Sequence, residues 1–256
     1  MSVQDILVSV IIPAYNCAGT IALALDSALM QDVPLEILVI DDGSKDDLDG
    51  VMARYETYQQ VRFLKNSQNL GAAETRNRGV SLAKGAYVAF LDADDYWEKG
   101  KLKKQLALIE EKNTVLCSTA RELMQPDGTR TGYVIPVKPE YTYKDIRLNN
   151  EINCSSVLLR TEVAKEFPMR HDDGHEDYLM WLEILRKYER GCAVNEPLLV
   201  YRVSNTGKSG SKWHSAGMTY RTYRHMGYGT LRSALYFVSY ALHGVKKYLL
   251  WFLKKA

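Results

Sequence analysis

Cysteine is scarce in this chain of 256 residues, and long apolar runs are missing from it. The four cysteines lie far apart and form no CxxC pair: Cys17, Cys117, Cys154 and Cys192. This spacing excludes a zinc cage and a disulfide framework, and it is typical of reduced thiols in a cytosolic protein. No apolar run reaches the roughly 18 residues that a membrane-spanning helix needs, so we do not expect an integral membrane protein.

Several nucleotide-binding and targeting motifs are also missing. No GxGxxG follows the first apolar run, which disfavours a dinucleotide-binding dehydrogenase. Gly207-Lys208-Ser209 matches the end of a P-loop, but Arg202 stands where the leading glycine belongs. The N-terminus has no basic region and no small-residue cleavage site, so no secretory signal is expected. The composition, 46% hydrophobic and 25% charged, excludes a collagenous or disordered protein.

Acidic residues are absent from the last quarter of the chain. Residues 1–196 have a net charge of −8 and residues 197–256 a net charge of +10, which together give the overall +2. A basic block of this kind indicates an anionic partner, such as a membrane surface or a nucleic acid. We therefore consider the body of the chain and its tail separately.

Short apolar runs alternate with helical patterns in the first half of the chain. Strands are expected at residues 7–13, 35–42, 61–66 and 86–95, and helices at 20–30, 72–83 and 101–112. Further strands are expected at 152–160 and 193–202, on either side of a helix at 176–187. Repeated strand–helix–strand units predict an α/β fold with a mostly parallel sheet and helices on both faces.

Each of the first four predicted strands ends in polar residues, and ligands bind at the carboxyl ends of such strands. Asp92 and Asp94 directly follow an apolar strand, one residue apart, so both can reach the same space. Asp46 and Asp95, taken singly, are typical of turns and helix caps. Clustered carboxylates are unfavourable unless a cation joins them, and hard oxygen ligands suit Mg²⁺ or Mn²⁺. Such an ion usually bridges substrate phosphates, so the sequence predicts a nucleoside diphosphate ligand.

Four segments of the chain together carry a family resemblance. They are SVIIPAYN (9–16), VIDDGSKDD (39–47), NLGAAETRNRGVSLAKGAYVAFLDADD (69–95) and GHEDYLMWLEI (174–184). Each motif is weak alone, but four in this order are highly specific. The chain resembles the inverting family 2 glycosyltransferases of the GT-A (Rossmann-like) fold over about residues 6–205.

The resemblance implies a nucleoside site in the loops after the first two strands. Pro13, Ala14, Tyr15 and Asp42 match the residues that surround the base and ribose, most often those of uridine. A tyrosine ring offers a face to a base, and a carboxylate can accept a hydrogen bond from a base N–H. Alternatively, Tyr15 is an aromatic residue that packs at a strand end.

The resemblance also implies a metal and donor site in Asp92-Ala93-Asp94, which matches the family's DxD motif. Asp94 is then the main ligand of Mn²⁺ or Mg²⁺, and Asp92, with Ala93, lies near the ribose and the metal shell. Arg76 matches a basic position near the nucleotide. The alternative for Arg76 is an ion pair on the surface of its helix.

Asp177 matches the family's catalytic base, which takes the proton of the acceptor hydroxyl as that oxygen attacks the sugar. Alternatively, Glu176 and Asp177 start a helix, where acidic residues are favourable, and both interpretations can hold together. His171 and His175, with the acidic residues around them, could instead form a transition-metal site. Gly174 makes a helical pairing of these two histidines doubtful.

The basic tail predicts a helix with a broad apolar face from Arg232 onward. Such a helix suits the interface of an anionic membrane. The alternatives are a helix that packs on the catalytic body or one that mediates dimerisation. Aliphatic side chains outnumber spaced aromatic and polar ones, so no nucleic-acid partner is expected.

We therefore expect residues 1–110 to form the nucleotide-sugar-binding half of one GT-A domain, 111–205 its acceptor-binding half, and 206–256 a basic amphipathic tail. The expected function is metal-dependent hexosyl transfer from a nucleoside-diphosphate sugar, with UDP as the expected nucleotide, to a saccharide acceptor. The resemblance and the tail favour a lipid-linked acceptor in O-antigen or capsule synthesis, and a cytoplasmic protein peripheral to the inner face of the membrane.

One rival is a non-catalytic sugar-nucleotide or membrane-binding module of the same fold. A nucleotidyltransferase is disfavoured because no Gly-rich basic loop follows the first strand.

Overall fold

Alternating side chains of the first strands divide the core into two layers. In β1 (Val8–Ala14), Val8, Val10 and Ile12 belong to one buried cluster and Ile11 to the other. Strands that are buried on both faces read as nearly continuous apolar runs, and this is why the sequence pattern identifies them. The structure is a computed structural model that describes residues 6–171, 173–203 and 212–255, with the backbone alone at 212–214 and 243–255. The Gly207-Lys208-Ser209 segment lies outside the described residues.

The described strands form a ten-stranded sheet in the order β3-β2-β1-β4-β9-β6-β10-β5, with β7 beside β6 and β8 beside β10. Their bounds, besides β1, are β2 (Leu35–Asp41), β3 (Val61–Lys65), β4 (Tyr87–Phe90), β5 (Tyr96–Trp97), β6 (Leu116–Met124), β7 (Arg130–Ile135), β8 (Glu140–Thr142), β9 (Leu158–Arg160) and β10 (Arg190–Arg202). Strands β3, β2, β1 and β4 pair in parallel, as do β6 and β10, whereas β9 is antiparallel to both of its neighbours. The predicted α/β fold is confirmed, and its parallel character lies chiefly in the first half.

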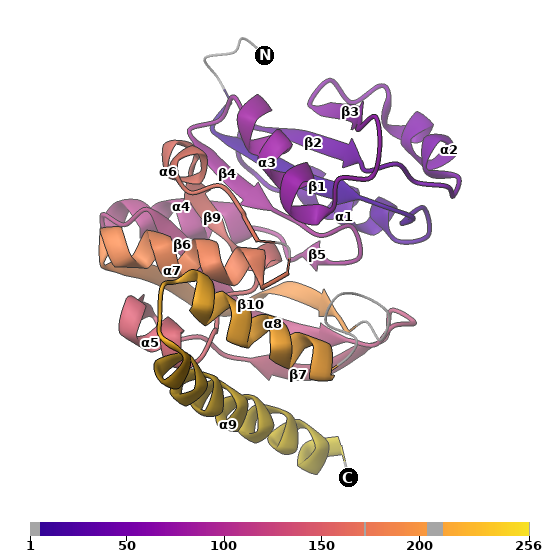
Figure 1. The fold of residues 1–256 in the computed structure, drawn as a ribbon. Coiled ribbons are helices and arrows are strands. Elements are labelled where there is room, and N and C mark those ends of the chain that lie inside the picture. The colour runs from indigo at the N-terminus through magenta and orange to yellow at the C-terminus, as the bar shows by residue number, and fades with distance from the viewer. Residues whose placement is uncertain (1–5, 172, 204–211, 256) are drawn as a thin grey trace.

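Helices cover both faces of the sheet (Figure 1). One face carries α1 (Ile21–Leu29), α2 (Leu48–Met52) and α4 (Lys101–Glu111), and the other carries α3 (Ala72–Leu82), α6 (Thr161–Glu166) and α7 (Glu176–Tyr188). The remaining helices are α5 (Tyr143–Leu148), α8 (Lys212–His225) and α9 (Thr230–Lys255). Among the described residues, we find no helix both long and apolar enough to cross a bilayer.

Two predicted strands are shorter than the sequence suggests. The strand expected at 86–95 ends at Phe90, and the N–H of Asp95 donates to the carbonyl oxygen of Asp92 (3.1 Å) in a turn. In the strand expected at 152–160, only the last three residues are extended in the sheet, because the side chain of Asn153 accepts the N–H of Ser155 (3.0 Å) and turns the chain. Both departures place polar groups at the ends of strands.

Gly79 lets α3 lie directly against β1. A Cβ atom at Gly79 would lie 2.4 Å from Cγ2 of Ile11, closer than real Cβ atoms come to their neighbours. This close approach brings the first turns of α3, including Arg76, to the carboxyl edge of the parallel strands.

Candidate active site

The loops after β1 and β2 lie side by side at the carboxyl edge of the sheet. Ala14 pairs in register with Asp41, and the N–H of Asp42 donates to the carbonyl oxygen of Ala14 (2.8 Å). Tyr15 is 49% exposed, so the alternative that its ring packs at a strand end is wrong. Ala14 is wholly buried and Pro13 half-buried, so these two residues form the floor beneath Tyr15 rather than an exposed surface. The structure therefore brings together the four residues predicted to form the nucleoside site.

Both carboxylate oxygens of Asp42 hold the loop that precedes α3. Oδ1 accepts hydrogen bonds from Nδ2 of Asn66 (2.7 Å) and the N–H of Leu70 (2.8 Å), and Oδ2 accepts one from the N–H of Gly71 (2.8 Å). A carboxylate can accept about four hydrogen bonds, and Asp42, which is 4% exposed, uses three of them within the protein. The role of Asn66 was not predicted from the sequence, although its place at the end of a predicted strand was a signal.

Arg76 is buried between the DxD segment and the start of α7. Its Nη2 donates to Oδ1 of Asp92 (2.5 Å), and its Nη1 lies 3.6 Å from Oε1 of Glu176. Arg76 is 7% exposed, so the alternative of an ion pair on the helix surface is wrong. Burial opposes its charge, but Asp92 and Glu176 help to raise the pKa of Arg76 well above its ordinary value. Arg76 thus joins two motifs that are widely separated in the sequence.

The three acidic residues after β4 differ in their surroundings. Burial, together with the charge of Asp92, raises the pKa of Asp94 to about 6. Asp95 is 1% exposed and its Oδ1 accepts the N–H of Arg202 (2.8 Å), so it stabilises the turn, as expected for this residue taken singly. Ala93 is buried in the core between the two aspartates.

The donor set of Asp92 and Asp94 fits a divalent cation. Carboxylate oxygens are the ligands that Mg²⁺ and Mn²⁺ prefer. Arg76 forms an ion pair with Asp92. The carboxylate of Asp94 is partly buried and lies near the negative charge of Asp92. A cation between the two carboxylates would relieve this repulsion.

Ser155 supports the DxD turn from behind. Its Oγ accepts the N–H of Asp92 (3.1 Å), and its carbonyl oxygen accepts the Nε1–H of Trp97 (2.7 Å). The sequence pattern predicted a strand at Ser155, and this contact was not expected from it. No local pattern signals it, because the partners come from distant parts of the chain.

Asp177 lies in the first turn of α7, directly after Glu176. Its Oδ1 accepts the N–H of Tyr178 (2.7 Å). Burial and the neighbouring charge of Glu176 raise the pKa of Asp177 above its ordinary value, although His175 and Arg76 oppose the shift. A carboxylate with a raised pKa is a stronger proton acceptor, so this position suits a base. The alternative that the two acids start a helix holds at the same time.

The structure does not bring His171 and His175 together as the alternative of a transition-metal site requires, in line with the doubt that Gly174 raised. The ring of His171 stacks on His225 of α8, with 3.9 Å between centroids, and Nε2 of His225 lies 3.0 Å from Oδ1 of Asp173. His175 contacts the backbone of α8 instead, with Nε2 3.2 Å from a carbonyl oxygen. Asp172 lies outside the described residues. Arg221 lies 3.6 Å from the Asp173 carboxylate and balances its charge, which disfavours a cation at the His171–Asp173–His225 cluster.

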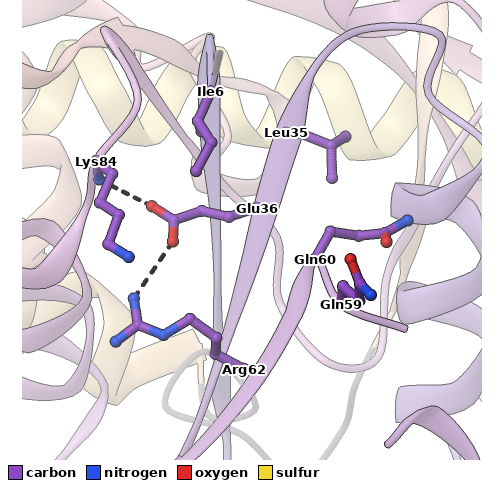
Figure 2. Close-up of a pocket in the computed structure, with 7 residues that line it drawn as sticks. All are labelled: Ile6, Leu35, Glu36, Gln59, Gln60, Arg62 and Lys84. Atoms are coloured by element: carbon purple, nitrogen blue, oxygen red, sulfur yellow. Dashed lines mark hydrogen bonds and ion pairs between the residues drawn. The ribbon is translucent and has the colours of Figure 1, made fainter. Parts of the chain in front are cut away.

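A separate hollow lies at the opposite, amino edge of the first strands (Figure 2). Its centre is Glu36, whose carboxylate accepts hydrogen bonds from the hydroxyl of Ser9 (2.7 Å), the N–H of Lys84 (2.8 Å) and the guanidinium of Arg62 (3.3 Å). These polar groups hold β1, β2, β3 and the end of α3 together. None of the predicted site residues lines this hollow.

Comparisons with known proteins agree with this geometry. Residues 9–164 match the model of the family described as Glycosyl transferase family 2. A glycosyltransferase assigned to teichuronic acid biosynthesis in Bacillus subtilis (strain 168), TuaG, is 35% identical over 94% of this chain and 97% of its own. An Escherichia coli glucosyltransferase, WfaP, whose name gives UDP-Glc and GlcNAc-diphosphoundecaprenol as its substrates, is 32% identical over 94% of this chain and 95% of its own.

Two solved structures share the fold. The S. aureus TarS 1–349 complex with UDP-GlcNAc has a TM-score of 0.73 at 19% identity, covering 94% of this chain and 73% of that one. The mannosyltransferase PcManGT from Pyrobaculum calidifontis, in complex with GDP-Man and Mn²⁺, has a TM-score of 0.69 at 19% identity, covering 90% of this chain and 69% of that one. The family match covers more than half of the chain, and the curated relatives align over nearly all of it. The chain therefore belongs to glycosyl transferase family 2, whose members related to it act in bacterial surface-polysaccharide synthesis.

Proposed function

We propose that this glycosyltransferase is inverting and metal-dependent, and that it moves a sugar from a UDP-linked donor to a hydroxyl of a lipid-linked saccharide. The observation that carries the proposal is the position of Arg76, which contacts Asp92 through one nitrogen and approaches Glu176 through another. It links the predicted donor site to the predicted base at one edge of the sheet. In this proposal residues 1–110 hold the donor and residues 111–205 hold the acceptor.

The donor site comprises the residues of the carboxyl edge. Tyr15 offers its exposed ring to the base, and Asp42 accepts the one further hydrogen bond that its carboxylate allows. The other residues assigned to the donor or to the cation are Pro13, Ala14, Arg76, Asp92, Ala93 and Asp94. The UDP-GlcNAc complex of TarS and the Mn²⁺ complex of PcManGT, which share the fold, support a nucleotide sugar with a divalent ion.

Asp177 supplies the proton acceptor of the reaction. It takes the proton of the acceptor hydroxyl while that oxygen forms a bond to the anomeric carbon, and the bond from that carbon to the diphosphate breaks on the opposite face. The configuration at the anomeric carbon inverts, and no covalent intermediate with the protein is needed. A bound Mn²⁺ or Mg²⁺ would offset the charge of the departing diphosphate.

Helix α9 supports a position at the membrane surface. Its aliphatic side chains at a helical spacing are exposed by 53–75%: Leu231, Leu235, Val238 and Leu242. An exposed aliphatic stripe on a helix of basic sequence suits the interface of an anionic bilayer. The sequence also allowed a tail helix that packs on the catalytic body. Tyr236, Phe237 and Tyr240, which lie away from the exposed stripe, pack against the core in this way. We place the protein in the cytoplasm, peripheral to the inner face of the membrane, where the lipid-linked acceptors named for the Escherichia coli relatives suggest its substrate.

Calorimetric titration with UDP, GDP and CDP, with and without Mn²⁺, tests the donor assignment. Mn²⁺-dependent binding of UDP that is weakened in Asp94→Ala supports the proposal. The Asp32→Ala variant, which changes an exposed aspartate, is the matched control. A folded sample that binds none of the three nucleotides would favour the rival, a non-catalytic module of the same fold.

A further inference from the structure

The described part of α9 presents two chemically different faces. Tyr236, Phe237 and Tyr240 pack against the core cluster that contains most of α7. The aliphatic stripe that begins at Leu231 is exposed instead. Figure 1 shows α9 at the lower end of the molecule, beside α5 and below α8. The aromatic face is thus partly buried against the body of the protein, and α9 is not a detached anchor.

Tyr178, the residue after Asp177, is where this aromatic face reaches α7. Its ring is fully buried, with its centroid 5.9 Å from that of Tyr240. Its hydroxyl donates to the carbonyl oxygen of Ile146 (2.9 Å) and lies 3.0 Å from the hydroxyl of Tyr223. The side chain beside the proposed base is therefore held by α5, α8 and α9 together.

Tyr236 closes the same cluster one turn earlier on α9. Its ring centroid lies 5.7 Å from Tyr223 and 5.0 Å from Tyr228, and the guanidinium carbon of Arg147 lies 4.5 Å from it. Aromatic and cation–π contacts at these distances are attractive beyond the area that they bury. Removing both tyrosines would take away the α9 rings that contact Tyr178 and Tyr223.

We propose that α9 is a positioning element of the active site: its aromatic face holds the first turn of α7, and with it Asp177, in the geometry that proton transfer requires. The inference rests on the proposed role of Asp177 as the base. A displacement of about 1 Å at a catalytic group can lower a rate about 100-fold, so a loosened first turn should be visible in turnover. The exposed aliphatic face stays available to a bilayer.

Hydrogen exchange of the Leu179 amide is the direct test, because this N–H donates to the carbonyl oxygen of His175 (2.9 Å) and closes the turn that contains Asp177. The variants are a Tyr236→Ala/Tyr240→Ala pair and a Tyr236→Phe/Tyr240→Phe pair, which keeps the rings. A Leu235→Ala/Val238→Ala pair on the exposed face is the matched control. Turnover of UDP-glucose and calorimetric affinity for UDP are measured on the same samples.

The Tyr236→Ala/Tyr240→Ala pair should speed exchange at the Leu179 amide by about tenfold or more, while the amides of β1 keep their protection. The Phe pair and the exposed-face pair should exchange like the wild type. The kcat of the Ala pair should fall about 10- to 100-fold with the affinity for UDP within about twofold of the wild-type value. Unchanged exchange at Leu179 would overturn the inference, and so would equal effects of the Ala and exposed-face pairs. Faster exchange with unchanged turnover would also overturn the inference, because the contact between α9 and α7 would then not position the base. Asp177→Asn tests the proposed function separately: normal turnover in that variant would refute Asp177 as the base, whatever α9 does.

Discussion

Replacing Asp94 with asparagine should stabilise the folded protein at neutral pH while removing its proposed cation site. Burial and the charge of Asp92 raise the pKa of Asp94 from 3.8 to about 6. One pKa unit corresponds to about 1.4 kcal/mol, so the ionised carboxylate destabilises the native state by up to about 3 kcal/mol. Partial solvent access reduces this figure, and we expect Asp94→Asn to gain about 1–2 kcal/mol in the free energy of unfolding at neutral pH.

The sign of the pH dependence follows from the direction of this shift. The pKa of Asp94 is higher in the folded state, at about 6, than its ordinary value of 3.8, so the folded state binds more protons between these two values. The stability contributed by this group therefore falls as the pH rises through that window. Asparagine does not titrate, so the advantage of the variant should be close to zero at about pH 4 and complete above about pH 7.

Urea unfolding followed by circular dichroism across this pH range measures the effect, first without divalent cations and then with Mn²⁺. A cation at about 100 times its dissociation constant should stabilise the wild type by about 2.7 kcal/mol and the variant by much less. Asp32→Asn, which changes an exposed aspartate, is the control. A variant less stable than the wild type at every pH would refute the reasoning, as would equal stabilisation of both proteins by Mn²⁺.

Four further predictions test other parts of the molecule. Asp177→Asn should lower kcat about 10²- to 10⁴-fold while calorimetry finds the affinity for UDP unchanged, since a proton acceptor is lost; normal turnover would contradict its role. Arg76→Met should lower the free energy of unfolding in urea by about 3–5 kcal/mol, because it leaves buried carboxylates without their partner; a loss below about 1 kcal/mol would show a weak pair. Gly79→Ala should cost about 1–3 kcal/mol in the same assay, because its methyl group meets β1. Leu235→Asp/Leu242→Asp should reduce cosedimentation with anionic vesicles, and undiminished binding would exclude the exposed face of α9 as the docking surface.

Local sequence patterns were sufficient for the first half of the fold because β1 and β2 are buried on both faces, and the edge strand β3 is half-buried with a short apolar run of its own. The apolar runs at 7–13, 35–42 and 61–66 became β1, β2 and β3 with nearly the expected bounds. Strand β6 was missed because Arg121 and Glu122 interrupt its apolar pattern. In the structure Glu122 accepts a hydrogen bond from Nε of Arg130 on β7 (3.1 Å), and Arg121 donates to a backbone carbonyl oxygen (3.2 Å). These partners come from other segments, and no periodicity within β6 signals them.

The sequence by itself determined which chemical groups stand at the ends of the strands, including the carboxylates of Asp92, Asp94 and Asp177 and the order of the motifs that identify the family. Only the tertiary structure decided that Arg76 is buried between two of these motifs and that the tail has an aromatic face turned to α7. The reason is physical: residue type and spacing are local properties, whereas burial, pKa and ion pairing depend on which distant segments the fold brings into contact.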